Sequence, residues 1–146
     1  MMTLQWLPYL WDDLRPVSTQ EIERLEHQLG VGFPKVYKEI VAQYQGMSPH
    51  PAVFNVGRGA SVINVFLTIV VDEKWRAYSV MRAYEVVKPH VPNGIYPFAN
   101  TPGGEYLCFD YRNSPDEPRI VLATVEMFLY PVADSFDAFL ASLHDA

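Results

Sequence analysis

Residues 95–110 read IYPFANTPGGEYLCFD, which is the pattern of two short strands joined by a tight turn. The first strand is predicted over 96–99 and its partner over 105–110. Between them, Thr101-Pro102-Gly103-Gly104 places proline and glycine in the order that a β-turn requires. The two glycines could also suggest a phosphate-binding loop, but no Lys-Ser/Thr pair or strand–helix context follows them. A β-hairpin is therefore the better interpretation.

The chain after this hairpin predicts more sheet and a final helix. Residues 112–118 form a polar loop, and two further strands are predicted over 119–124 and 128–132. Asp134 or Ser135 can cap a helix over 135–144. The apolar face of that helix consists of Phe136, Phe139, Leu140 and Leu143.

The chain before the hairpin begins with a predicted helical pair. Ser18-Thr19-Gln20-Glu21 is a capping box, which starts a helix over 19–29 that Gly30 ends. Phe33-Pro34 then opens a second helix over 34–45. Because only four residues join the two helices, we expect them to be antiparallel.

The remaining segments are less regular. A short helix is predicted from Pro8 to Leu14, and 47–61 has no sustained period and is interpreted as a loop. The β-branched run 62–71 predicts a buried strand, and Asp72 can cap a helix over 73–88. Two helices, then at least four strands between 62 and 132, then a helix predict an α+β fold with an antiparallel sheet.

Length and composition favour one globular domain over residues 1–146. Hydrophobic residues make up 49% and charged residues 19% of the chain, a balance typical of a folded core. Cys108 is the only cysteine, so we expect a reducing, cytoplasmic location. We expect no secretory signal, and the longest apolar run, 62–71, is too short to span a membrane.

The net charge of −6 is unevenly distributed. Residues 1–104 carry nine acidic and nine basic side chains, whereas residues 105–146 carry eight acidic and two basic ones. Such a field disfavours nucleic acid and favours a basic partner. The alternative is that the acidic charge serves solubility alone.

Several segments together resemble a known family. They are residues 22–30, 33–40, 96–99, 103–110 and 132–140. In this order they look like the SUKH superfamily, which contains fungal cell-wall-assembly regulators of the Smi/Knr type and many bacterial immunity proteins. The resemblance covers about residues 18–143.

The resemblance implies an α+β fold and, for bacterial members, neutralisation of a polymorphic toxin by binding its toxic domain. The matched residues are caps, turns and core positions, so no catalytic role comes with them. The chain departs from the family pattern at Phe33, where leucine is usual. It departs again at Tyr44-Gln45-Gly46-Met47, where asparagine followed by glycine is common.

The residues that could carry chemistry have ordinary structural interpretations. Cys108 lies mid-strand, where a buried thiol behaves as a small hydrophobe. The histidines show no metal-ligand spacing, so we expect no metal site and no cofactor. Asp110 ends its strand and can anchor the following loop, although an acid/base role with a second acid stays open.

Two exposed acidic tips, Asp72-Glu73 and Asp116-Glu117, are the candidate partner-binding residues. Acids near aromatic anchors would contact a basic protein, and the alternative is that they are solvated turns. We therefore expect a non-catalytic protein-binding domain, an immunity protein for a cognate toxin, with a monomer favoured. The other hypotheses are a regulatory or scaffold domain with an endogenous partner, and a small hydrolase using Asp110 and a histidine.

Overall fold

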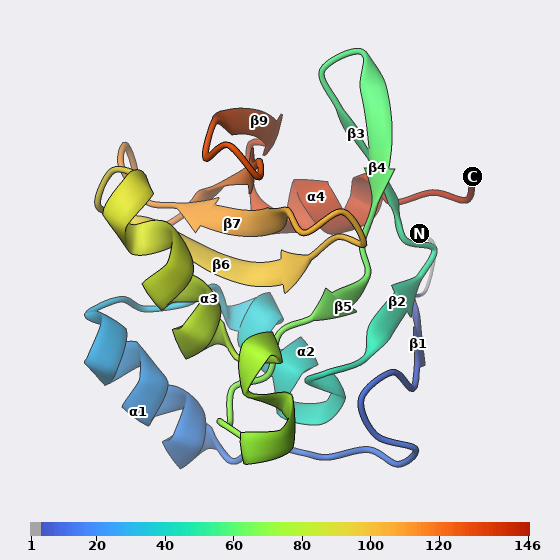
Figure 1. Cartoon of the computed structure of the whole chain (residues 1–146), viewed down its shortest axis with the longest axis vertical. Helices are drawn as coiled ribbons and strands as arrows, with labels where there is room; N and C mark the ends of the chain where they lie inside the picture. Colours follow the sequence, from blue (N-terminus) through green and yellow to red (C-terminus); the bar gives the residue numbers. More distant parts are fainter. Residues whose placement is uncertain (1–3) are drawn as a thin grey trace.

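The computed structural model describes residues 4–146, and its centre is a five-stranded antiparallel sheet (Figure 1). The strands follow one another in chain order, and they are β5 (Val65–Phe66), β6 (Ile95–Asn100), β7 (Tyr106–Asp110), β8 (Arg119–Ala123) and β9 (Leu129–Ala133). The predicted hairpin joins β6 to β7, with Tyr96 opposite Phe109 and the Gly104 N–H donating to the Thr101 carbonyl over 3.1 Å. The α+β fold class and the antiparallel sheet are thus confirmed.

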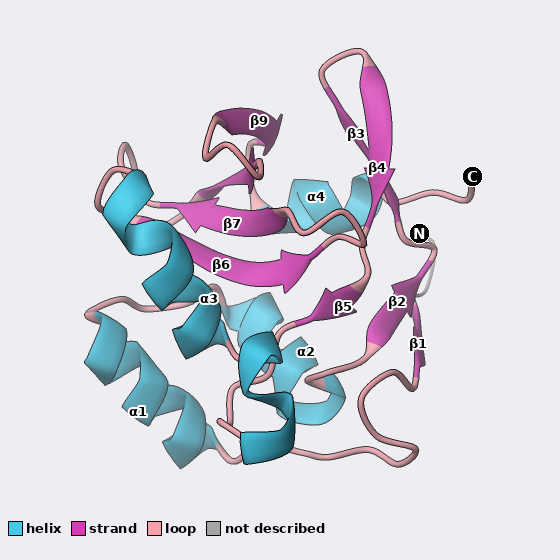
Figure 2. Cartoon of the chain, viewed as in Figure 1, coloured by secondary structure: helices cyan, strands magenta, loops and turns pink. Residues whose placement is uncertain are grey.

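Within residues 4–146, four α-helices accompany the sheet, and they are drawn in cyan in Figure 2. They are α1 (Thr19–Leu29), α2 (Lys35–Tyr44), α3 (Val80–Val87) and α4 (Phe136–Ser142). The capping box forms as predicted: the Glu21 N–H donates to Ser18 Oγ, and the Glu21 carboxylate accepts the Ser18 N–H, both over 3.1 Å. Gly30 ends α1 at φ 72°, and Ser135 caps α4. Among residues 4–146, no helix is both long and apolar enough to cross a membrane.

An aromatic core lies between α2, α4 and one face of the sheet. Phe98 and Phe109 stack there with ring centroids 4.4 Å apart, and Tyr37 of α2 meets Phe109 edge-on at 5.0 Å. Phe136 of α4 contacts the same rings. Because strand side chains alternate between faces, Cys108 and its neighbours on β6 and β8 form a smaller buried cluster on the opposite face.

Two segments in the first half of the chain differ from the prediction. The predicted helix from Pro8 to Leu14 is wrong: β1 (Gln5–Leu7) pairs with β2 (Ser48–His50), and bends follow. The cause is tertiary, since Trp6 stacks on Tyr44 at 5.2 Å and the backbone after it bonds to the end of α2. The loop predicted over 47–61 is also wrong, because β3 (Val53–Val56) and β4 (Gly59–Val62) form a hairpin that projects from the body (Figure 1).

The strand predicted over 62–71 and the helix predicted over 73–88 are each interrupted. The first contains the end of β4, then β5, and a bridge from Thr68 to Ser79. The second divides at Ser79 into a 3-10 helix, η1 (Glu73–Tyr78), and α3, and a further 3-10 turn, η2 (Lys88–His90), follows. The Thr68 N–H donates to Tyr78, and the Val80 N–H donates to Thr68. These tertiary bonds replace helical ones, so the helix breaks there.

Candidate functional site

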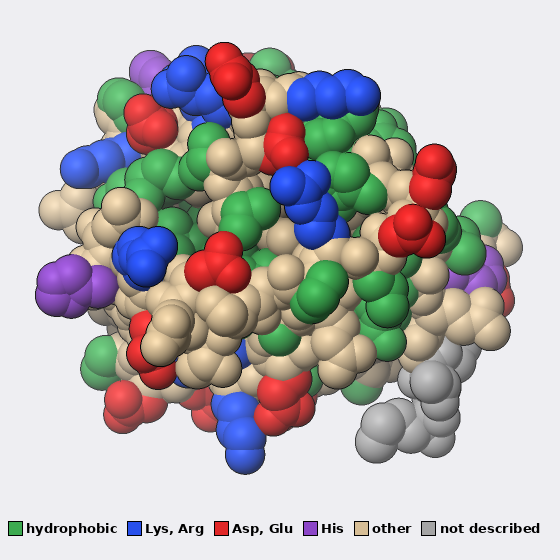
Figure 3. Space-filling view, turned by 90° about the horizontal axis from the view of Figure 1, so that it is seen from below, with side chains coloured by type: hydrophobic (Ala, Val, Ile, Leu, Met, Phe, Trp, Pro, Cys, Tyr) green, Lys and Arg blue, Asp and Glu red, His purple; other side chains and the backbone are tan. Residues whose placement is uncertain are grey.

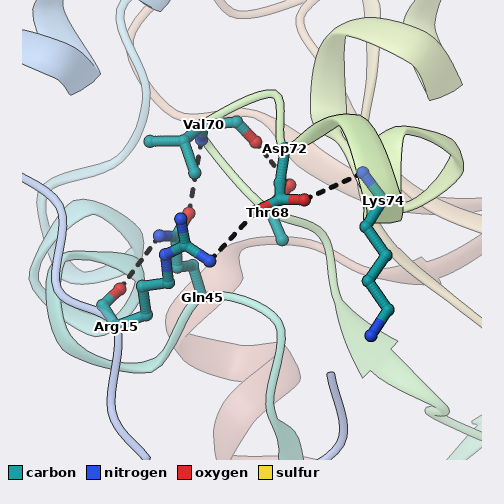
Figure 4. A network of polar contacts seen from close by, with 6 residues as sticks. All are labelled: Arg15, Gln45, Thr68, Val70, Asp72 and Lys74. Carbon is teal, nitrogen blue, oxygen red and sulfur yellow. Dashed lines mark hydrogen bonds and ion pairs between the residues drawn. The ribbon is translucent and has the colours of Figure 1, made fainter. Parts of the chain in front are cut away.

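The segment 69–75 lies between the loop 11–15 on one side and α1 and α3 on the other. A Gln45-centred network holds these parts together (Figure 4). The Gln45 amide nitrogen donates to the Arg15 carbonyl over 2.9 Å, and its oxygen accepts the Ile69 N–H over 2.8 Å and the Val70 N–H over 3.3 Å. Only 1% of Gln45 is exposed. One buried side chain therefore satisfies backbone groups of two separate segments.

Sequence reasoning missed this role of Gln45. The available signal was its position directly after α2, where the residue departs from the family pattern. A polar residue at the end of an otherwise amphipathic helix gives no indication of what its side chain will meet. The partners come from residues 15, 69 and 70, which only the tertiary structure brings to it.

An ion pair closes the same network at the surface. The Arg15 guanidinium lies 3.0 Å from the Asp72 carboxylate, which also accepts the Lys74 N–H over 2.9 Å (Figure 4). Asp72 thus caps η1, as its position in the sequence predicted for a helix start. Because the Asp72 carboxylate is paired with Arg15 within the chain, its main role is to order the loop, and little of its charge is left for a partner.

Two tryptophans flank this ion pair, and each carries a cation on its ring. The Arg15 guanidinium lies 4.7 Å from the Trp11 ring centroid, and the Lys74 ammonium lies 5.0 Å from that of Trp75. Cation–π contacts of this kind restrain long side chains that would otherwise be mobile. Between the two rings lies a cleft of about 540 Å³, whose lining includes Asp12 and Asp13.

Two further cavities adjoin the exposed side chain of Val71. One, of about 320 Å³, lies against α1 and is lined by residues such as Arg24 and Gln28. The other, of about 390 Å³, lies against α3 and includes Glu73 and Arg82. Seen from the side to which α1 and η1 turn, acidic, basic and hydrophobic side chains are interspersed (Figure 3). We call residues 69–75 with the three adjoining cavities the lower face.

The structure does not bring the two predicted acidic tips together. Asp72 and Glu73 belong to the lower face, where Glu73 is exposed in the first turn of η1. Asp116 and Glu117 are exposed in the loop before β8 and line a cavity of about 140 Å³ that includes Lys35. The cavity that Asp116 and Glu117 line includes neither Asp72 nor Glu73.

Asp110 anchors its loop through Arg112. The guanidinium donates to both carboxylate oxygens over 2.8 and 3.0 Å, and the Arg112 N–H donates over 3.0 Å. Burial raises the pKa of the Asp110 carboxyl, but the hydrogen bonds and charge of Arg112 outweigh it and hold that pKa below its usual range. A carboxylate so fully engaged is a poor acid/base group, which favours the anchoring interpretation.

Three further side chains that could carry chemistry are buried or contact other residues of the chain: Cys108, His144 and His50. Cys108 is fully buried, and burial raises the pKa of its thiol, which suppresses the reactive thiolate. His144 contacts Asn55, and His50 lies 3.4 Å from Asp145. Within residues 4–146, no group of three or more His, Cys, Asp or Glu side chains is placed to hold a metal ion.

The chain is thus a small α+β domain in which helices cover an antiparallel sheet, and its lower face is open and carries charges of both signs. The chain belongs to the SMI1/KNR4 family (SUKH-1), whose model matches residues 16–142. This match begins just before the cap of α1 and ends with α4, so it includes the five-stranded sheet and the helices α1 to α4. The resemblance to the SUKH superfamily is confirmed. A comparison with curated proteins found no match.

Proposed function

We propose that this chain is a non-catalytic immunity protein that neutralises a cognate bacterial toxin by binding its toxic domain. The observation that carries the proposal is membership of the SUKH-1 family, because the SUKH superfamily includes bacterial immunity proteins. Neutralisation by binding needs a stable surface that covers or distorts the toxin. It needs no reacting group on the immunity protein.

The lower face has the properties that such a surface requires. Gln45 and the Arg15–Asp72 pair fix the backbone of segment 69–75 before any partner arrives, which lowers the entropic cost of binding. Trp11 and Trp75 are partly exposed, and tryptophan is among the commonest anchors in protein interfaces. Glu73 adds an exposed charge beside them, which can pair with a basic partner.

The acidic C-terminal part of the chain supports the same proposal, because its charge acts over a longer range than direct contacts do. The eight acidic side chains of residues 105–146 would attract a basic toxin domain and repel nucleic acid. Asp116 and Glu117 are exposed within this part and remain proposed contact residues.

The test is co-expression of the chain with the toxin encoded beside its gene. The toxin alone should stop growth, whereas co-expression should restore growth and give a complex that co-purifies. Glu73→Lys should weaken rescue, and Glu23→Lys, an equal charge change on exposed α1, is the matched control. Undiminished toxicity in the presence of excess folded chain would contradict the proposal. A regulator or scaffold would instead co-purify with an endogenous partner that is no toxin.

A further inference from the structure

A second surface lies between two hairpins and shares no lining residue with the lower face. The β3–β4 hairpin contributes Val56 and Ala60, and the β8–β9 hairpin contributes Leu122 and Tyr130 to a groove of about 370 Å³. In Figure 1 the β3–β4 hairpin projects beside β9, which forms the edge of the sheet. The volume suits a few side chains of a partner, since small-ligand sites start at roughly 300 Å³.

One exposed aromatic ring, Tyr130, lines this groove, and a second, Phe128, lies close to it in sequence on the same β8–β9 hairpin. Leu122 is paired with Tyr130, and the ladder continues with the Thr124 N–H donating to the Phe128 carbonyl over 2.9 Å. Because strand residues two apart share a face, Phe128 and Tyr130 lie on the same side as Leu122. Their exposed fractions are 63% and 49%. Large exposed aromatics grouped beside a groove are characteristic of interaction surfaces.

The turn that presents Phe128 has an unfavourable backbone. Met127 has φ 68°, the left-handed region that glycine normally occupies, and it is the one non-glycine residue with positive φ in the part of the chain that the structure describes. The Met127 N–H donates to the Thr124 carbonyl over 2.8 Å, and the Phe128 N–H donates to Thr124 Oγ1 over 3.1 Å. A turn held tightly in a strained conformation fixes where Phe128 points.

The charges around the groove indicate the charge of the partner that would fit it. Glu105 lines it and Glu126 is exposed on the β8–β9 turn, whereas Arg58, in the β3–β4 turn, is the nearby cation. A second copy of this chain would bring the same carboxylates, and the same acidic C-terminal part, against themselves. A partner segment with lysine or arginine beside apolar side chains would instead match both the rings and the acids.

We propose that the groove between the two hairpins binds a polypeptide segment in which apolar side chains are flanked by lysine or arginine. The proposal rests on the proposed function only in taking the partner to be a protein. Tyr130 and Phe128 are the apolar anchors, and Glu105 and Glu126 pair with the basic side chains.

The test is an NMR titration of the isotope-labelled chain with a short blocked peptide that alternates lysine with valine. The backbone amides of Ala60, Glu105 and Tyr130 should shift saturably, and the same peptide with glutamate for each lysine should have no effect. Phe128→Ala should weaken binding by about tenfold, as truncation of an aromatic anchor does. Leu7→Ala is the matched control, because Leu7 is 49% exposed on β1 and lines neither the groove nor the cavities of the lower face.

Glu105→Gln with Glu126→Gln should weaken the lysine peptide several-fold and remove most of its salt dependence. Equal binding of the two peptides, shifts confined to other faces, or indifference to Phe128→Ala would overturn the proposal. A dimer in light scattering that Phe128→Ala dissociates would overturn it in favour of a second copy. The assay uses no toxin, so its failure leaves toxin neutralisation standing, and a failure of growth rescue leaves the groove's peptide binding standing.

Discussion

Two buried polar residues, Gln45 and Asp110, hold irregular parts of the chain in place through side-chain hydrogen bonds. Gln45 binds the loop at Arg15 to the segment at Ile69, and Asp110 binds Arg112. Removing either partner of a buried hydrogen bond costs more than the bond itself contributes, because the remaining group stays unpaired. Single substitutions at these two positions therefore test the account at the residue scale.

Gln45→Ala should lower the free energy of unfolding by about 2–4 kcal/mol, because it leaves the buried Ile69 N–H and the Arg15 carbonyl without their partner. Gln28→Ala, on the exposed side of α1, should change it by less than about 0.5 kcal/mol. Denaturant unfolding of the purified variants measures both. A loss for Gln45→Ala no larger than that for Gln28→Ala would mean that the network carries no stability.

Asp110 should make the chain less stable in acid. Its pKa in the folded chain lies below the unfolded value of about 3.9, so its contribution is fully present above that pH and is lost as pH falls through the folded pKa. At neutral pH, Asp110→Asn should therefore be less stable than the unmodified chain. The difference should shrink as pH falls below about 4. A difference independent of pH, measured by urea unfolding at several pH values, would contradict this assignment.

At the scale of elements, the helices α1 and α4 and the hairpin between β6 and β7 follow local signals. The caps of α1 and α4 and the turn between β6 and β7 are readable in the sequence, and all of them form. The β3–β4 hairpin has short strands and weak alternation, so its pairing was not predicted. The β8–β9 turn stores strain at Met127, where local preference and final structure disagree.

A pair of substitutions tests that strain. Met127→Gly removes a Cβ at φ 68° and should stabilise the chain by up to about 1 kcal/mol, after the entropy that glycine adds to the unfolded state. Gly104→Ala adds a Cβ at φ 83°, where no atom lies within 4 Å, and should cost about 1 kcal/mol. Thermal unfolding measures both. Changes of the same sign in the two variants would rule out backbone strain as the cause.

At the scale of the whole molecule, charge distribution and fold are largely independent. The net charge of −6 lies in residues 105–146, which include the exposed tip Asp116-Glu117. Glu26, in contrast, accepts the Phe33 N–H over 2.6 Å and lies 3.5 Å from Lys38, so it holds α1 and α2 together. Charge reversals that test steering must therefore avoid Glu26.

Asp116→Lys with Glu117→Lys should slow association with a basic partner by up to about tenfold, because surface charges steer encounters. The effect should fade at about 1 M salt, where the Debye length is about 3 Å. Glu23→Lys with Glu39→Lys is the matched control on exposed positions of α1 and α2. Association kinetics against the captured partner at two salt concentrations measure this. An on-rate indifferent to both salt and reversal would assign the acidic charge to solubility.

The sequence by itself determined the fold class, the ends of α1, the start of α4, and the family, because caps, turns and apolar periods act over a few residues. It also indicated that Asp110 anchors its loop, since its partner is two residues away. Only the tertiary structure decided the break at Ser79, the role of Gln45 and the separation of the two acidic tips. Each of these depends on contacts between residues ten or more positions apart, which no local pattern records.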